Sequence, residues 1–218
     1  FRYPARNGAL AVSHKSDWRR PTFARMVRRA ARWRNPMNRL AGTALAFCLM
    51  AAPAFAALKV GDKAPDFSAQ ASLGGKQFAF SLADALKKGP VVLYFYPAAF
   101  TKGCTIEAHD FAEATPKFQA LGATVIGVSH DKIETLDKFS VSECRSKFAV
   151  AADPDGKVIK AYDAKMPVMP YANRTSYVIA PDNTVLMEYT DMSPDHHVAK
   201  TIAAVEAWRA KHPQEAAK

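Results

Sequence analysis

One stretch of the sequence, residues 91–107, does most to restrict how this chain can fold. It opens with the apolar, β-branched and aromatic run Val91–Tyr96, which is typical of a strand buried on both faces. Pro97 ends the run because it has no N–H to offer a sheet ladder. A helical pattern then begins around Cys104, with apolar positions at Ile106, Ala108, Phe111, Ala112 and Phe118. The stretch therefore predicts a buried strand joined by a short turn to a helix.

Cys104 stands at the start of that predicted helix. The first turn of a helix has N–H groups without helical partners and the positive end of the helix dipole, and both favour an anion. A cysteine in such a place favours the thiolate, which is the form that acts as a nucleophile. The position alone indicates a reactive cysteine and leaves the reaction open.

The positive charge of the chain belongs to its N-terminal part. The formal net charge is +10, but residues 1–56 hold 11 of the 30 Lys and Arg residues and 1 of the 20 Asp and Glu residues. Residues 57–218 therefore carry 19 of each sign and are neutral. A neutral domain has no electrostatic footprint for DNA or RNA, so we expect no nucleic-acid partner.

Residues 37–56 have the pattern of a secretory signal peptide. A short positive segment, Met37–Arg39, precedes the apolar run Leu40–Ala52, and Ala54–Ala56 fits the small-x-small cleavage pattern, with cleavage after Ala56. The run is shorter than the roughly 20 apolar residues that a membrane span needs. We therefore expect an exported protein without a stable membrane anchor, most simply in a bacterial periplasm.

Residues 1–36 are rich in arginine and have no apolar period, so they are predicted to be a disordered basic leader. The sequence opens with Phe, and the alternative is that these residues are upstream sequence, with Met26 or Met37 as the true start. Residues 57–218 have the size of one ordinary domain with a core of its own.

The rest of this domain alternates short apolar runs with helical patterns. Gly74 and Gly75 mark a turn, so Phe67–Ser72 and Gln77–Phe80 are predicted to pair as a hairpin. Buried strands separated by helices, then a second hairpin and a last helix, favour an α/β fold on a mixed sheet. Helix 131–144 is expected to have Ile133, Leu136, Phe139 and Val141 on its apolar side, and Ser193-Pro194-Asp195 to open a final helix with Pro194 in its first turn. The other expected elements are helix 81–86, strand 91–96, helix 104–121, strand 123–129, strand 148–152, helix 158–162 and hairpin 176–189.

The motif Pro97-x-x-x-Thr101-x-x-Cys104 resembles the active-site signature of the peroxiredoxins, which are thiol peroxidases. The resemblance runs over residues 58–211 and includes Gly61–Phe67 and Arg174–Ile179. The sequence around Cys104 is most similar to the bacterioferritin-comigratory, or Q-type, branch. The resemblance implies a thioredoxin-like fold, in which helices flank a mixed central β-sheet that carries an N-terminal hairpin extension. It also implies reduction of hydrogen peroxide or organic hydroperoxides.

The same resemblance implies a role for each matched residue. Cys104 is the peroxidatic thiolate, and Arg174 is the permanent cation held beside it. Thr101 has a hydroxyl that positions the O–O bond, and Pro97 shapes the turn and shields the thiolate from water. Glu107, one helical turn after Cys104, orients Arg174 through a charge-assisted bond.

A sulfenic acid formed at Cys104 must be recycled through another thiol. In part of this branch that thiol lies five residues on, where this chain has His109. Other members have it in the next helix, which Cys144 ends here. We expect Cys144 to be the resolving cysteine, in an intramolecular disulfide that a thioredoxin-like or other thiol donor reduces. The alternative is a one-cysteine peroxidase in which Cys144 is buried and inert.

Other functions are less favoured. A thiol–disulfide oxidoreductase needs Cys-x-x-Cys, and this chain has Thr101 in place of the first cysteine. A redox-responsive binding or holdase module remains an alternative. We expect no cofactor. We also expect no metal site, because adjacent His196 and His197 would point about 100° apart on a helix. Both histidines are predicted to be exposed. A monomer and a homodimer both fit the sequence.

Overall fold

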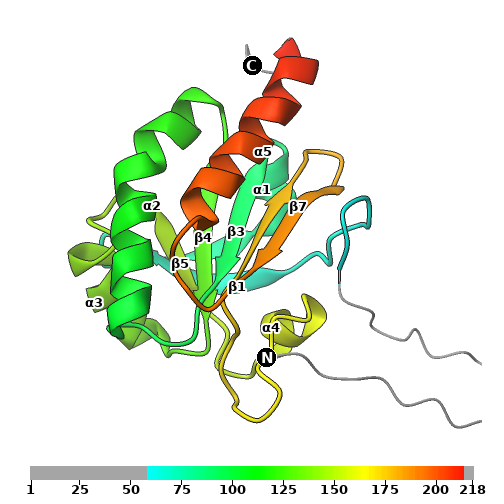
Figure 1. The fold of residues 1–218 in the computed structure, drawn as a ribbon. Coiled ribbons are helices and arrows are strands. Elements are labelled where there is room, and N and C mark those ends of the chain that lie inside the picture. The colour runs from blue at the N-terminus through cyan, green and yellow to red at the C-terminus, as the bar shows by residue number, and fades with distance from the viewer. Residues whose placement is uncertain (1–57, 214–218) are drawn as a thin grey trace, which may run out of the picture. The chain divides into compact units, whose positions relative to one another are not determined.

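The computed structural model describes residues 58–213 (Figure 1). The predicted basic leader and signal peptide, residues 1–56, lie outside the described residues, so both stay predictions. Within residues 58–213, no helix has the length and apolar character that crossing a membrane requires.

A mixed sheet of seven strands forms the centre of the fold, in the order β2-β1-β5-β4-β3-β6-β7. The strands β3, β4 and β5 run parallel, while β6 and β7 on one side and β1 and β2 on the other are antiparallel to their neighbours. The predicted N-terminal hairpin is confirmed as β1 and β2. The strands are β1 (Ser68–Leu73), β2 (Lys76–Ser81), β3 (Val91–Phe95), β4 (Thr124–Ser129), β5 (Ala149–Ala152), β6 (Thr175–Ile179) and β7 (Val185–Thr190).

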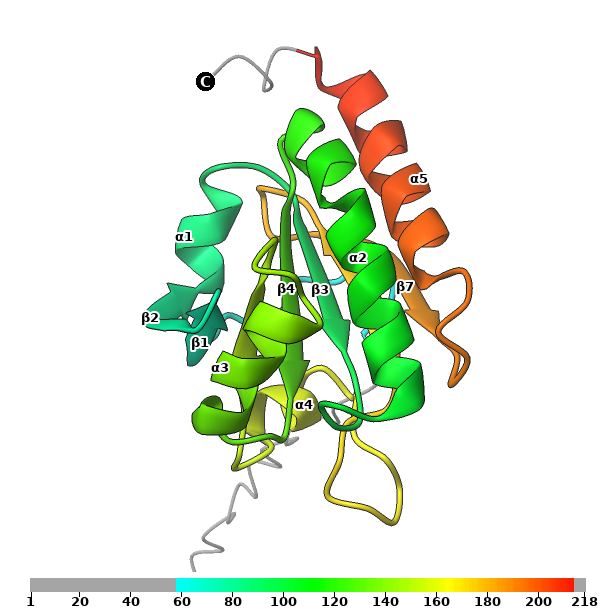
Figure 2. The same ribbon diagram turned by 90° about the vertical axis from the view of Figure 1, so that its left-hand side faces the viewer.

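Helices cover both faces of the sheet. One apolar cluster contains side chains of α2, α3 and α5, and the other contains side chains of α1 and α4. Figure 2 shows α2 and α5 side by side on the first face, with α3 over the β1 and β5 side. The helices are α1 (Leu82–Leu86), α2 (Lys102–Ala120), α3 (Ile133–Ser142), α4 (Lys157–Ala161) and α5 (His197–Lys211).

The strand β3 is buried on both faces, as its continuous apolar sequence predicts. Leu93 and Phe95 point into the cluster with α1 and α4, whereas Val92 and Tyr94 point into the cluster with α2, α3 and α5. Successive strand side chains alternate between faces, so one short run contributes to both cores. This burial fixes the end of β3, and with it the start of α2.

Two predicted helices differ from the structure. The prediction of a helix over 131–144 is too long: α3 ends at Ser142, so Cys144 lies beyond it, and Val141 is 51% exposed rather than on the apolar side. The prediction that Pro194 lies in the first turn of the last helix is wrong. The helix begins at His197, because the Ser193 side chain bonds to Asp195 in a local turn and His196 has a left-handed φ of 71°.

Candidate active site

Cys104 is the third residue of α2. This helix follows β3, beyond the carboxyl end of the strand (Figure 1). Thr101 is the N-cap, with an extended backbone, and the first helical bond runs from the Thr105 N–H to the Thr101 carbonyl at 2.9 Å. The side chain of Cys104 is 1% exposed. The predicted placement of this thiol in the first turn of a helix, after a buried strand, is therefore confirmed.

The turn between β3 and α2 is held by a residue that sequence reasoning missed. Asp131, after β4, accepts hydrogen bonds from the Ala99 N–H and from the Ser129 hydroxyl, both at 2.8 Å. The Thr101 hydroxyl donates to the Ala98 carbonyl at 3.0 Å, and Pro97 is half-buried at the start of the turn. Asp131 was expected only to open a helix; its contact with the turn depends on β4 lying beside β3.

Arg174 lies against Cys104, where the resemblance to the peroxiredoxins placed it. It stands directly before β6, whose first residue, Thr175, pairs with Phe95 at the end of β3. Its Nη2 is 3.5 Å from the Cys104 sulfur, its Nη1 contacts the Glu107 carboxylate, and its Nε donates to the Met192 carbonyl at 3.0 Å. The guanidinium thus joins the thiol, a carboxylate and the backbone after β7.

Gly103 provides the space for this contact. A Cβ at Gly103 would lie 3.0 Å from Arg174 Nη2, closer than side-chain carbons normally approach. Glycine has no Cβ, so the guanidinium can pass next to the helix backbone and reach the sulfur of the following residue. The small residue before Cys104 belongs to the site, although no periodic pattern in the sequence points to it.

Glu107 is fully buried one turn after Cys104. Burial raises the pKa of its carboxyl to about 8, against the opposing effect of Arg174. Burial alone would lower the pKa of Arg174, but the neighbouring Glu107 and Cys104 outweigh it and the pKa is raised. The guanidinium therefore keeps its charge, while the carboxyl can hold a proton near neutral pH.

A buried histidine that was predicted to be exposed lies behind Glu107. His197, the first residue of α5, has its Nδ1 2.8 Å from the Ser176 hydroxyl and 3.7 Å from Glu107 Oε1. Its Nε2 lies 3.0 Å from the Asp191 carbonyl. The prediction failed because it placed the start of the last helix too early, and the side chain of His197 was therefore expected on the exposed face. The adjacent His196 is exposed, as predicted.

A model of the AhpC/TSA family matches residues 60–187. The chain belongs to this family. A putative peroxiredoxin of the bcp type from Helicobacter pylori is 34% identical over 154 residues, which cover 68% of this chain and 98% of that protein. The peroxiredoxin Bcp of Bacillus subtilis is 30% identical over 151 residues, 66% of this chain and 93% of that protein.

Solved structures agree with the sequence relatives. The crystal structure of the peroxidoxin BcpB from Mycobacterium tuberculosis has a TM-score of 0.64 at 32% identity, covering 69% of this chain and 97% of that one. A PrxQ mutant from Xylella fastidiosa has a TM-score of 0.63 at 25% identity, covering 70% of this chain and 98% of that one. The predicted thioredoxin-like fold, with helices around a mixed sheet, is confirmed, and the chain is a peroxiredoxin of the bacterioferritin-comigratory type. It is a thiol peroxidase, which reduces a peroxide at the expense of a thiol.

The second cysteine of the described peroxiredoxin domain, Cys144, is a buried free thiol two residues beyond α3. It belongs to the same apolar cluster as Cys104, and the two are not bonded to each other. Burial, with a further contribution from Glu143, raises the pKa of the Cys144 thiol well above its ordinary value. The thiol is thus stored in its unreactive, protonated form in this structure.

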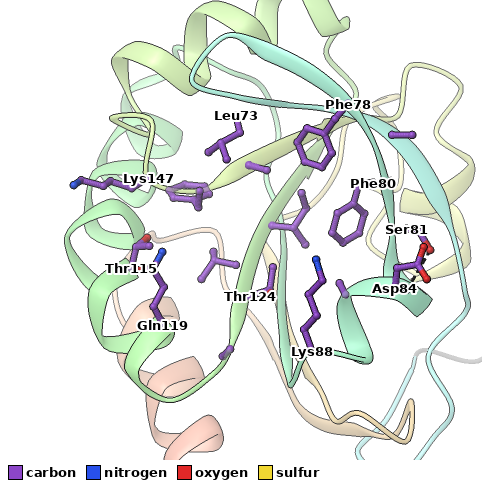
Figure 3. A pocket seen from close by; sticks show the side chains of 17 residues that line it. Leu73, Phe78, Phe80, Ser81, Asp84, Lys88, Thr115, Gln119, Thr124 and Lys147 are labelled. Atoms are coloured by element: carbon purple, nitrogen blue, oxygen red, sulfur yellow. Dashed lines mark hydrogen bonds between the residues drawn. The ribbon is translucent and has the colours of Figure 1, made fainter. Parts of the chain in front are cut away.

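A separate apolar pocket of about 470 Å³ opens elsewhere in this peroxiredoxin (Figure 3). Its walls come from β1, β2, β4, β5 and α1, together with Thr115 and Gln119 in the later part of α2. None of the residues around Cys104 lines it. Residues 58–213 contain no group of three or more His, Cys, Asp or Glu side chains arranged to hold a metal ion.

Proposed function

We propose that this peroxiredoxin uses Cys104 as the peroxidatic thiolate and Cys144 as the resolving thiol. The contact that carries the proposal is the 3.5 Å approach of Arg174 Nη2 to the Cys104 sulfur in the first turn of α2. A permanent cation and a helix N-terminus both favour negative charge on that sulfur. The family supplies the coarser statement, a peroxide substrate and a thiol reductant.

In the first step, the Cys104 sulfur bonds to one peroxide oxygen while the O–O bond breaks. The bonding electrons leave with the second oxygen, which takes up a proton and departs as water or an alcohol. Cys104 is oxidised to a sulfenic acid. The Arg174 N–H groups are donors for the negative charge that develops on the oxygens. The Thr101 hydroxyl donates to the Ala98 carbonyl in this structure, and in this scheme it rotates to donate to the peroxide instead. Pro97 limits the access of water to the sulfur.

Glu107 keeps Arg174 in position during this step. Arg174 reaches Glu107, Cys104 and the Met192 carbonyl with three different nitrogens, so its planar fork is fixed at three points. A guanidinium held in this way needs little rearrangement when charge develops, which is the source of electrostatic catalysis in a buried site.

In the second step, the Cys144 sulfur attacks the Cys104 sulfur and releases the sulfenic oxygen as water, which forms an intramolecular disulfide. Both thiols are buried in this structure, so the start of α2 and the segment around Cys144 must open. The backbone supports this: Arg145 and Ser146 both have left-handed φ values, 52° and 55°, which cost energy for residues other than glycine. Opening the segment releases that strain.

A thiol donor then returns the enzyme to its dithiol form. We propose a thioredoxin-like protein or another thiol donor, whose thiols are oxidised to a disulfide as they supply the two electrons that reduce the Cys104–Cys144 disulfide. The enzyme works as a monomer or a homodimer in this scheme, because the residues proposed for the reaction come from one chain.

Peptide mapping of the peroxide-treated chain tests this scheme. The full chain carrying Cys48→Ser, which removes the third thiol, is treated with three equivalents of hydrogen peroxide and digested without reduction. A peptide linking Cys104 to Cys144 is expected. Sulfinic acid on Cys104 beside a free Cys144 would instead support the one-cysteine alternative. In parallel, the Cys104→Ser variant is expected to consume no peroxide. The Cys144→Ser variant is expected to reduce one peroxide per Cys104, which is the first turnover.

We further propose that residues 37–56 direct export and are removed after Ala56. The support is the order of a positive segment, an apolar run and small residues at the cleavage position. A disulfide-forming peroxidase also suits an oxidising compartment. Expression of the full chain in a bacterium, fractionation of the cells and N-terminal sequencing of the product test this, and a product that starts upstream of Ala57 would contradict it.

A further inference from the structure

His197 is a fully buried titratable side chain that the proposed mechanism leaves without a task. Both of its ring nitrogens have partners. Nε2 lies 3.0 Å from the Asp191 carbonyl, which can only accept, so Nε2 carries a proton. Nδ1 lies 2.8 Å from the Ser176 hydroxyl, and the Tyr189 ring packs against the imidazole with 4.7 Å between ring centres. The imidazole is therefore held in one orientation.

That orientation directs Nδ1 toward Glu107. The distance from Nδ1 to Glu107 Oε1 is 3.7 Å, and Oε1 has no hydrogen-bond partner among the described residues. The other carboxyl oxygen, Oε2, contacts Arg174 Nη1. A buried oxygen without a partner is costly, so the position of His197 next to it needs an explanation.

Charge balance supplies that explanation. Arg174 has one positive charge and faces two groups that can be negative, the Cys104 thiol and the Glu107 carboxyl. A carboxylate at Glu107 would compete with the thiolate for that single charge in a buried site. A proton kept on the Glu107–His197 pair removes the competition.

We propose that His197 is a positioning residue for peroxide reduction. Ser176 holds the imidazole beside the Glu107 carboxyl, and the imidazole keeps one proton on the Glu107–His197 pair, so that the charge of Arg174 serves the Cys104 thiolate. The inference rests on the proposed role of Cys104 as the attacking thiol. His197 itself acts through Glu107 and Arg174 and does not touch the peroxide.

The electrostatics of the pair agree with this geometry. Burial raises the pKa of Glu107 to about 8, and burial together with Arg174 lowers the pKa of His197, despite the hydrogen bond to Asp191 that favours its charged form. At neutral pH the pair thus holds one titrating proton, on Glu107. The charged or titratable groups that face the pair from the packed elements are Arg174 before β6, Cys104 and Asp110 in α2, Tyr94 in β3, and Tyr189 and Asp191 at the end of β7.

A double-mutant cycle between Glu107 and His197 tests the proposal. The measured quantity is the second-order rate constant for oxidation of Cys104 by hydrogen peroxide, obtained in the full chain by competition with a second peroxidase. His197→Gln keeps a donor toward Asp191 but removes the nitrogen that faces Glu107, and it is expected to lower the rate constant by about ten- to a hundredfold. In the Glu107→Gln background the same substitution is expected to have no further effect. Equal losses in both backgrounds would mean a role in folding alone and would overturn the proposal.

Two variants on neighbouring positions serve as controls. His197→Asn keeps a polar group at the Nδ1 position and is expected to recover most of the rate. His196→Asn changes the exposed histidine next in sequence, at a left-handed position that asparagine tolerates, and is expected to leave the rate unchanged. If His197→Gln does not fold, Ser176→Ala decides the question, since it removes only the hydroxyl at Nδ1; an unchanged rate constant in Ser176→Ala would then overturn the proposal.

The pH profile gives a readout that a purely structural role would not move. In the wild type, the rate constant is expected to fall as the pH rises through about 8, where Glu107 loses its proton. The fall is expected to be absent in Glu107→Gln and to shift toward lower pH in His197→Gln. If the pH midpoint of this fall is the same in His197→Gln as in the wild type, the proposal is contradicted. Absence of peroxide consumption in the wild type would instead contradict the proposed role of Cys104.

Discussion

The Nε2 of His109 lies 2.9 Å from a carboxylate oxygen of Glu143, which ties α2 to the residue directly before Cys144. A second pair joins the residue directly after Cys144 to the same helix, with Arg145 Nη1 3.1 Å from Glu113 Oε1. Cys144 is therefore flanked by two contacts to the helix that carries Cys104. His109 occupies the position where the resemblance allowed for a resolving cysteine, and here it contacts the segment that carries the proposed one.

Removing these contacts is expected to speed formation of the Cys104–Cys144 disulfide. A pair at or near the surface is worth about 0.2–1 kcal/mol, so Glu113→Ala and Glu143→Ala should each raise the rate by about 1.4- to fivefold. Glu143 also raises the pKa of Cys144, so Glu113→Ala is the variant that isolates the tether. Rapid alkylation of the remaining thiols after a peroxide pulse gives the rate.

Glu206→Ala is the matched control for this experiment. It removes the pair between Glu206 and Lys117, at 2.8 Å, which holds α2 to α5 and not to the Cys144 segment. An equal acceleration in Glu206→Ala would show that general loosening of α2, and not the tether, limits the reaction.

The raised pKa of Glu107 predicts a pH dependence of stability. The folded protein holds this proton up to about pH 8, whereas the unfolded chain releases it near its ordinary value of 4.5. Between these values the folded state binds more protons, so this carboxyl stabilises the protein fully below about pH 4.5 and its contribution is lost as the pH rises through 8. The difference in unfolding free energy between the wild type and Glu107→Gln, measured by urea denaturation, should fall over this window. A difference that is flat with pH would refute the buried, protonated carboxyl.

Arg174→Lys is expected to lower the rate constant of Cys104 oxidation by about a hundred- to a thousandfold, as loss of a transition-state donor does. Lysine keeps the charge but has no fork that reaches Glu107, Cys104 and the Met192 carbonyl together. Arg209→Lys is the control, because Arg209 contacts the Leu121 carbonyl beyond the last residue of α2, far from Cys104. Stopped-flow measurement with hydrogen peroxide compares the two, and a nearly normal rate in Arg174→Lys would rule out a need for the fork.

Gly103→Ala separates stability from activity. Alanine favours a helix over glycine by about 1 kcal/mol, so the melting temperature should be kept or rise. Its Cβ would stand 3.0 Å from Arg174 Nη2 and push the guanidinium away from the sulfur, which should lower the rate constant by about tenfold or more. A calorimetric scan and the peroxide assay on the same preparation check both effects. A normal rate would mean that Arg174 can shift without loss.

Much of the scaffold could be predicted from local pattern. The strand Val91–Phe95, the start of α2 and the hairpin of β1 and β2 follow from apolar runs, a proline and paired glycines, which act over a few residues. The ends of helices were harder to predict. The side-chain hydrogen bond of Ser193 and the left-handed φ of His196 place the start of α5 at His197. Because α5 begins later than predicted, His197 is buried and not exposed.

The sequence by itself determined that Cys104 lies in the first turn of a helix after a buried strand, because both features depend on neighbours in the chain. The resemblance to the peroxiredoxins named Arg174 as the cation beside that thiol, but the physical placement of the side chains around it is decided by the tertiary structure alone. Pairing of β6 with β3 brings Arg174 to the sulfur across 70 residues, and packing of α5 on α2 and β6 brings His197 to Glu107 across 90. Such contacts depend on strand pairing and helix packing, which no local pattern in the chain encodes.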